Sequence, residues 1–137
     1  ILSADTKKAD ARVSEALGML RGRAVIRLRA LQEVDGRPVS LSEDYFNRSR
    51  FPQINEYALQ TLSITESLRL CGVSDYFRKR TRVTTRLPKR DEAEILRQPH
   101  NRPILVTENL DIDDTGKPVS FGFTLWSGDR VQLVFEG

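Results

Sequence analysis

The segment that most constrains the fold of this chain is VIRLRALQEVDGRPVSLSEDY, residues 25–45. Two extended runs within it are joined by Asp35-Gly36, which is the residue pair of a tight hairpin turn. Residues two apart on a strand share a face, so Arg27 and Arg29 are expected to project from the same side, about 7 Å apart. The alternate residues of that run are mostly apolar and suit a core. The segment therefore predicts a β-hairpin with one apolar face and an arginine pair on the other.

The rest of the chain has the apolar spacing of short helices and strands, separated by turn residues. The expected order is a helix, two strands, a helix, a strand, a short helix and three strands. Hairpins dominate this order, which predicts a single domain over residues 1–137 with an α+β fold, an antiparallel sheet with helices packed against it. Residues 47–55, which include Pro52, are expected to be irregular. The predicted helices cover residues 5–17, 63–71 and 91–98, and the predicted strands cover residues 24–34, 37–46, 74–87, 103–113, 117–127 and 129–135.

The composition excludes several classes of protein. Its 39% hydrophobic and 30% charged residues are typical of a soluble globular protein. No apolar run approaches the roughly 18 residues of a membrane span, so no membrane partner is expected. A single cysteine, Cys71, excludes an internal disulfide and suits a cytoplasmic protein. The net charge of +3 permits an acidic partner without requiring one. Because the chain begins at Ile1 without an initiator Met, we expect a fragment of a longer protein.

Arg27 and Arg29 suggest a site for a small anion. A guanidinium group presents paired donors that match the oxygens of a phosphate, a phosphonate or a carboxylate. The alternative is that the two arginines lie on a solvated face or pair with Glu33 and Glu43, because surface arginines are common. Spacing alone leaves both interpretations open.

Residues 119–126 alternate between two strand faces. One face is apolar, and the other consists of Ser120, Gly122, Thr124 and Trp126. Small polar residues beside one aromatic side chain suit the wall of a ligand cavity, where the glycine leaves room and the hydroxyls orient a ligand. The alternative is a strand whose outer face meets water, although that would expose the indole. The pattern slightly favours the cavity.

The most basic segment is YFRKRTRVTTRLPKR, residues 76–90. Strand alternation predicts that Arg78, Arg80, Arg82 and Arg86 share one face. Such a face could meet nucleic-acid phosphates, but the aromatic residues lie only at one end, so no base-stacking platform is evident. A solvated face, a dimer interface or an additional wall of an anion pocket is favoured over direct nucleic-acid binding.

No pattern in the sequence predicts catalysis. There is no nucleophile elbow, phosphate-loop glycine pattern or dinucleotide fingerprint. His100 is the only histidine, and with one cysteine these two residue types make no zinc site. We therefore expect no catalytic residue, no metal and no cofactor.

Three stretches occur in order along the chain: ALGMLRGRAVIRLRALQEVDGRPVSLSEDYF, SITESLRLCG and TGKPVSFGFTLWSGDRVQLVF. Together they resemble the effector-binding (UTRA) domain of GntR-type transcriptional regulators of the HutC subfamily. The similarity extends from Ala16 to Phe135. Within the subfamily, VIRLRALQEVDG and TRVTTR are most similar to the phosphonate-metabolism repressor branch.

This resemblance implies a chorismate-lyase-like fold with a ligand cavity, in a homodimer. It implies the sensing domain of a repressor that meets operator DNA only through an N-terminal winged helix-turn-helix, a module that this sequence lacks. Relatives that respond to sugar phosphates hold the anion with an Arg-x-Arg pair and a serine that opens the second helix, and these motif positions fall on Arg27, Arg29 and Ser63. With Thr65 and the polar face of residues 119–126, the predicted effector site comprises Arg27, Arg29, Ser63, Thr65, Ser120, Thr124 and Trp126.

The departures from the family pattern bear on the effector. Many relatives carry glutamates where this chain has Ser42 and Ser120, and a tyrosine where it has Trp126. The loss of two acids argues against an amino-sugar phosphate and favours a smaller anionic effector. The alternative function is a chorismate-lyase-type enzyme acting on an aromatic acid, although both candidate acidic positions are serine here. A third possibility is an RNA-binding module that uses the basic strand.

Overall fold

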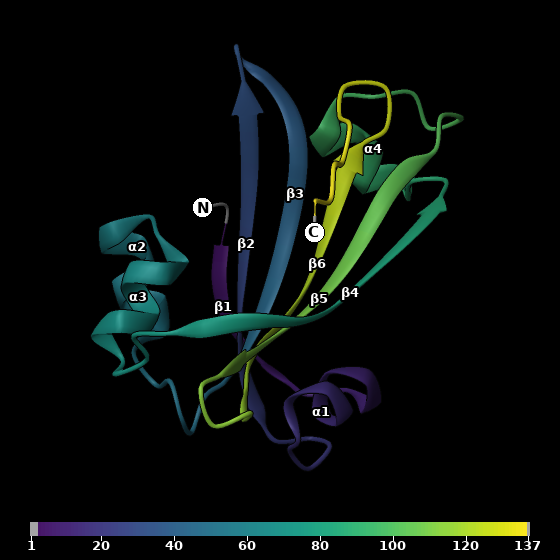
Figure 1. Cartoon of the computed structure of the whole chain (residues 1–137). Coiled ribbons are helices and arrows are strands. Elements are labelled where there is room, and N and C mark those ends of the chain that lie inside the picture. The colour runs from purple at the N-terminus through teal and green to yellow at the C-terminus, as the bar shows by residue number, and fades with distance from the viewer. Residues whose placement is uncertain (1–2, 137) are drawn as a thin grey trace.

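The computed structural model describes residues 3–136, and within this range six strands form one antiparallel sheet in the order β1-β2-β3-β6-β5-β4 (Figure 1). The α+β class predicted from the sequence is confirmed. No helix in the described range is long and apolar enough to cross a membrane. The strands are β1 (Ser3–Lys8), β2 (Ala24–Val34), β3 (Arg37–Asn47), β4 (Tyr76–Arg86), β5 (Ile104–Asp113) and β6 (Pro118–Ser127), and the helices are α1 (Ala11–Leu17), α2 (Ile54–Thr61), α3 (Ile64–Leu70) and α4 (Arg90–Leu96).

The two hairpins of the sheet are built as their turn residues predict. Between β2 and β3, Asp35 and Gly36 have φ of 52° and 75°, and a type I′ turn needs positive φ at both central residues. Between β5 and β6, the Oδ1 atom of Asp113 accepts hydrogen bonds from the backbone N–H groups of Thr115 and Lys117, both at 2.9 Å. Positive φ at Asp35-Gly36 and the hydrogen bonds to the Asp113 side chain therefore stabilise the two hairpin turns.

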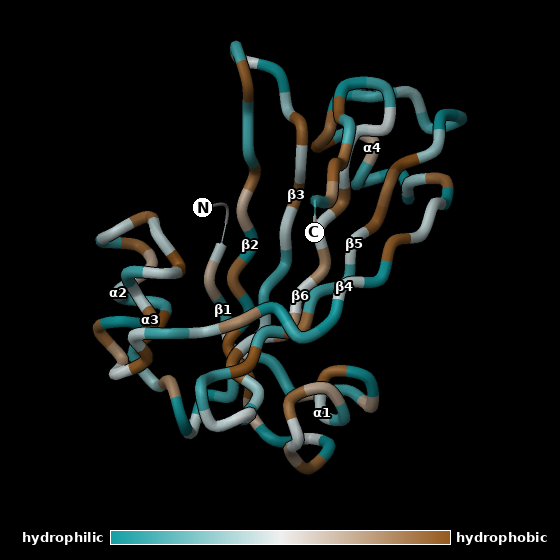
Figure 2. Tube along the Cα trace, in the orientation of Figure 1, coloured by the Kyte–Doolittle hydropathy of each residue, from teal (hydrophilic) through white to brown (hydrophobic). Residues whose placement is uncertain are grey.

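The helices cover the two faces of the sheet unequally. We call the side covered by α1 and α4 face A and the side covered by α2 and α3 face B. In Figure 1, α1 and α4 lie at opposite ends of face A, whereas α2 and α3 lie together at one end of face B. Apolar residues gather under each helix, as the brown segments of Figure 2 indicate. The three resulting cores include Val13, Leu17, Val25 and Phe121 under α1, Leu41, Leu96, Ile104 and Leu125 under α4, and Ile26, Phe46, Ile54 and Leu68 under α2 and α3.

Three segments of the structure differ from the prediction. Residues 3–8 form β1 on the edge of β2, and the first helix starts only after Asp10, whose Oδ1 accepts from the N–H of Val13 at 2.9 Å. Helix α2 was not predicted, because only two of its residues, Ile54 and Ala58, are buried and because the helix closely follows Pro52. No strand follows β6 in the described residues, since β3 and β5 already occupy both edges of β6.

Strand β4 contains a β-bulge that changes the direction of one arginine. Its register with β5 shifts between Arg78 and Arg80, so Arg78 lies opposite Asp111 while Arg80 lies opposite Leu110. Adjacent residues of β5 point to opposite faces, and therefore Arg78 projects on face B while Arg80 projects on face A. The prediction that Arg78 shares a face with the other arginines of β4 is wrong. Figure 2 shows that β4 is hydrophilic along most of its central length.

Candidate functional site

A cleft of about 380 Å³ opens on face B beside α3. Its floor is formed by β2, β3, β6 and β5, and the edge strand β4 and the start of α3 form its rim. Such a volume suits a small molecule, because ligand pockets start at about 300 Å³. Three residues of the predicted site line it, namely Ser120, Thr124 and Trp126. The other lining residues are Ala30, Leu31, Gln32, Ser40, Ser42, Asp44, Ile64, Tyr76, Arg78, Asn109 and Asp111.

Hydrogen bonds hold the side chains of β6 in the floor of the cleft. Ser120 is buried, and its hydroxyl donates to Oδ2 of Asp111 at 3.2 Å. The indole Nε1–H of Trp126 donates to Oγ1 of Thr107 at 3.0 Å, which directs the ring toward β5. The aromatic wall is therefore fixed in place, and the hydroxyl of Ser120 is already engaged by an acid.

Two carboxylates in the cleft were missed by reasoning from the sequence. Asp111 accepts a hydrogen bond from Nε of Arg78 at 2.6 Å, and Asp44 lies on β3, opposite Gly122. Burial, followed by the charge of Asp111, raises the pKa of Asp44 to about 7, although Arg78 acts in the opposite direction. The available signal was strand parity, because Asp44 shares a face with Ser42.

The predicted residues of α3 lie at the margin of the cleft. Ser63 is the N-cap of α3, and its Oγ accepts from the backbone N–H of Glu66 at 3.1 Å. The hydroxyl of Thr65 lies 2.6 Å from that of Tyr76, and this contact ties α3 to β4. Ile64, between them, is the residue of α3 that lines the cleft.

Arg27 and Arg29 lie on face A, on the opposite side of the sheet from α3. Arg27 donates from Nε and Nη2 to the two carboxylate oxygens of Asp5, at 3.0 and 2.9 Å. Arg29 forms an ion pair with Glu43 at 3.0 Å. The structure therefore does not bring this arginine pair together with α3 and the polar face of β6, and binding of a small anion by the pair stays a prediction. The alternative of ion pairing describes both arginines, with Asp5 in place of Glu33.

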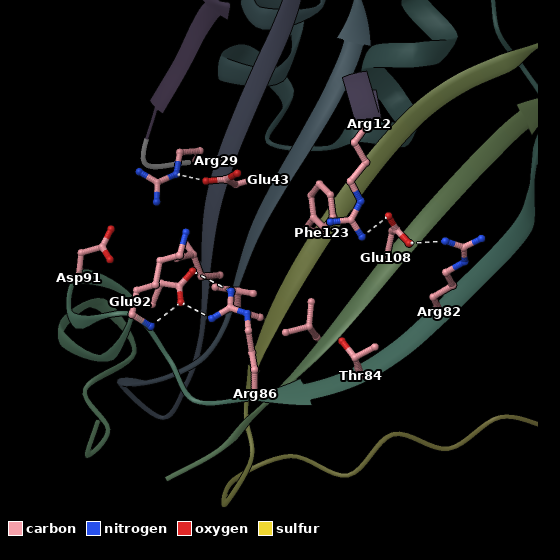
Figure 3. Close-up of a pocket in the computed structure, with 14 residues that line it drawn as sticks. Arg12, Arg29, Glu43, Arg82, Thr84, Arg86, Asp91, Glu92, Glu108 and Phe123 are labelled. Atoms are coloured by element: carbon pink, nitrogen blue, oxygen red, sulfur yellow. Dashed lines mark hydrogen bonds and ion pairs between the residues drawn. The ribbon is translucent and has the colours of Figure 1, made fainter. Parts of the chain in front are cut away.

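A larger cavity of about 590 Å³ lies on face A between α1 and α4. Its floor is apolar, with Leu41, Val106, Phe123 and Leu125, and its rim is charged. Figure 3 shows that most of the rim charges pair with one another. The pairs are Arg29–Glu43, Arg86–Glu92 at 2.7 Å, and Arg12 and Arg82 with Glu108 at 2.6 and 3.7 Å.

The family model described as UTRA domain matches residues 1–132. The chain belongs to the UTRA domain family. The recognition made from three sequence stretches is thereby confirmed, and so is the chorismate-lyase-like fold class of this UTRA domain.

The relatives of this UTRA domain are transcriptional regulators by name. An uncharacterized HTH-type transcriptional regulator, RB1450, from Rhizobium meliloti (strain 1021) is 30% identical over 93% of this chain and 52% of its own length. The probable transcriptional regulator PhnF from Escherichia coli (strain K12) is 26% identical over 95% of this chain and 54% of its own length. The chain thus spans about half the length of these curated relatives. The crystal structure of a PhnF C-terminal domain has a TM-score of 0.85 and 27% identity, covering 99% of this chain and 86% of that one.

Proposed function

We propose that this chain is the effector-binding domain of a transcriptional regulator of the GntR type and the HutC subfamily. The observation that carries the proposal is the cleft on face B beside α3, in a chain that belongs to the UTRA domain family. A small effector with an anionic group would bind there. A phosphonate, a phosphate ester and a carboxylate are the candidates, and the phosphonate agrees with the repressor branch that the sequence resembles.

Arg78 is the residue we propose to hold the anionic group. It is the one basic residue among those lining the cleft, within the part of the chain that the structure describes. Its Nε donates to Asp111, its Nη1 donates to Thr81 at 3.3 Å, and 49% of the side chain is exposed. Donors of the guanidinium group therefore remain for a ligand. The hydroxyls of Ser120 and Thr124 and the ring of Trp126 would shape the rest of the site.

In the complete regulator, ligand binding would control a DNA-binding domain outside this chain, in a cytoplasmic homodimer. An effector can shift such a system only by its different affinity for two arrangements of the dimer. The HTH-type name of the Rhizobium relative supports a helix-turn-helix as that DNA-binding domain. The domain described here would then sense the effector and dimerise without reading DNA sequence itself.

The test is a thermal-shift panel with phosphate, methylphosphonate, glycerol phosphate and benzoate. A ligand at about 100 times its dissociation constant stabilises a protein by roughly 2.7 kcal/mol, which is a shift on the order of 10 °C for a domain of this size. We expect Arg78→Gln to abolish the shift.

The matched control is Arg80→Gln, which removes the same group from the same strand on face A. Arg27→Gln and Arg29→Gln test the pair predicted from the sequence, and we expect both variants to keep the shift. If the thermal shift survives Arg78→Gln but disappears in Arg27→Gln or Arg29→Gln, the anion binds on face A and not in the cleft. Sedimentation of the chain at several concentrations tests the dimer.

A further inference from the structure

The floor of the face-B cleft contains an acidic pair on the two strands that flank β6. Asp44 of β3 lies opposite Gly122, and Asp111 of β5 lies opposite Ser120. Gly122 leaves the space that the Asp44 carboxylate occupies, because a Cβ atom at this glycine would lie 2.2 Å from Oδ1 of Asp44. The strand between the two acids is therefore shaped to admit a carboxylate at the centre of the cleft.

The two acids differ in how their charges are balanced. Asp111 receives hydrogen bonds from Arg78 at 2.6 Å and from Ser120 at 3.2 Å. The carboxylate of Asp44 has no hydrogen bond and no ion pair within 4.0 Å among residues 3–136. Of the charged residues that line the cleft in this range, two are acids and one is an arginine. With all three ionised, the cleft carries one uncompensated negative charge at Asp44.

We propose that the effector carries a protonated amine in addition to its anionic group, and that Asp44 and Asp111 bind this amine; the assignment rests on the proposed function of the cleft. An ammonium group has three donors and no acceptor, and the two carboxylates and the neighbouring hydroxyl of Ser42 are acceptors for them. The effector is thus a small zwitterion that places its acid at Arg78 and its amine at Asp44.

The environment of Asp44 supports a cation as the missing partner. Its pKa is raised by burial and by Asp111, lowered by Arg78 and, as the smallest of these contributions, raised by its chain neighbour Glu43. The protein groups around Asp44 therefore make its ionised form unfavourable, and a bound ammonium would offset that cost. A bound metal ion is less suitable, because no three His, Cys, Asp or Glu side chains come together as ligands in the described residues.

Two ligands of equal length that differ only at the amine provide the test. We would titrate the chain at pH 7.5 by calorimetry with 2-aminoethylphosphonate and with propylphosphonate, whose terminal methyl replaces the amine. The expected result is that the amine ligand binds at least tenfold more tightly. Asp44→Asn should reduce this preference to less than threefold. Asp44→Ser, whose shorter side chain leaves the space beside Gly122 unoccupied, should reduce it to the same extent. Arg78→Gln should weaken both ligands by similar factors.

Each outcome separates the inference from the function on which it rests. Equal binding of the two phosphonates to the parent, or a preference that survives both substitutions at Asp44, overturns the amine site and leaves the proposed anion site intact. If neither phosphonate binds, we would titrate the corresponding carboxylates. These are β-alanine, which carries the amine, and butyrate, which carries the methyl group in its place. Failure of all four overturns both the proposed function and the inference. Circular dichroism and thermal unfolding of each variant show whether it is folded.

Discussion

The carboxyl group of Asp44 makes the stability of the ligand-free domain depend on pH. Its pKa is about 7 in the folded protein because of burial and Asp111, compared with 3.8 for an ordinary aspartate. Between these pH values the folded state holds a proton that the unfolded state releases. The free energy of unfolding therefore falls as the pH rises from about 4 to about 7, by at most a few kcal/mol, and the contribution of Asp44 is constant above that range.

The Asp44→Asn variant isolates this effect from other titrating groups. Urea unfolding at pH 4.5, 5.5, 6.5 and 7.5 should show the variant gaining stability relative to the parent as the pH rises. Asp75→Asn, at an exposed position, is the matched control and should follow the parent. Parallel pH profiles for Asp44→Asn and the parent would contradict the raised pKa.

A second prediction at the scale of one residue concerns Gly122. A Cβ atom here would lie 2.2 Å from Oδ1 of Asp44 and 3.0 Å from the backbone oxygen of Glu43. Gly122→Ala should therefore destabilise the domain by about 1–3 kcal/mol, as overpacking commonly does. In an Asp44→Ala background the cost should be clearly smaller, because the nearer obstacle is gone. Urea unfolding of the four proteins measures the coupling, and equal costs in both backgrounds would mean that the backbone contact dominates.

At the scale of an element, α3 depends on its first residue. It has only seven residues, and the Ser63 side chain satisfies the N–H group of Glu66. Ser63→Ala should destabilise the domain by about 1 kcal/mol, whereas Ser63→Asp keeps a capping oxygen and should cost much less. Chemical unfolding of both variants is the measurement. The same pair tests the predicted anion contact, because a negative charge at this position would lower the affinity for an anionic ligand only if the ligand lies near it.

The strands show where alternation predicts side-chain direction and where it fails. Along β6 it places Ser120, Thr124 and Trp126 on one face, and the structure agrees because the ladder is regular there. Along β4 it fails at Arg78, since one extra residue on this strand opposes β5 and reverses the direction. A bulge is a property of two paired strands, so neither sequence reveals it alone. The same limit hid β1, whose polar residues form a strand because β2 offers an open edge.

At the scale of the whole molecule, the difficulty lies in deciding which helix covers which face. Each part of the predicted site was argued from local spacing or from motif position, and the three elements that carry it, β2, α3 and β6, lie where the sequence predicts them. The sheet nevertheless separates Arg27 and Arg29 on face A from Trp126 on face B, where α3 packs. Asp44 was not predicted for a related reason. The space that its carboxylate occupies is provided by Gly122, and its pKa is raised in part by the charge of Asp111, and these residues lie on two other strands. The family resemblance predicted the fold, whereas the set of side chains that share the face-B cleft can be identified only in the assembled sheet.

The last prediction concerns how segments distant in the chain are held together on face A. Glu108 of β5 is only 5% exposed, and it pairs with Arg12 of α1 at 2.6 Å and Arg82 of β4 at 3.7 Å. The guanidinium of Arg12 also lies over the ring of Phe123, at 4.8 Å. Arg12→Met leaves a buried charge with one distant partner and should cost about 1–3 kcal/mol. Glu108→Gln leaves two arginines that are mostly exposed, and should cost less than about 1 kcal/mol.

The order of these two costs is the decisive point, because a simple count of ion pairs predicts the reverse: Glu108 takes part in both pairs and Arg12 in one. In a Glu108→Gln background, Arg12→Met should become nearly neutral, apart from its contact with Phe123. Urea unfolding of the single and double variants measures the cycle, with Arg80→Met as a control for removing an exposed arginine of face A. Additive costs would mean that Arg12 stabilises α1 by packing alone. A strong coupling would mean that one buried carboxylate joins α1 to the centre of the sheet.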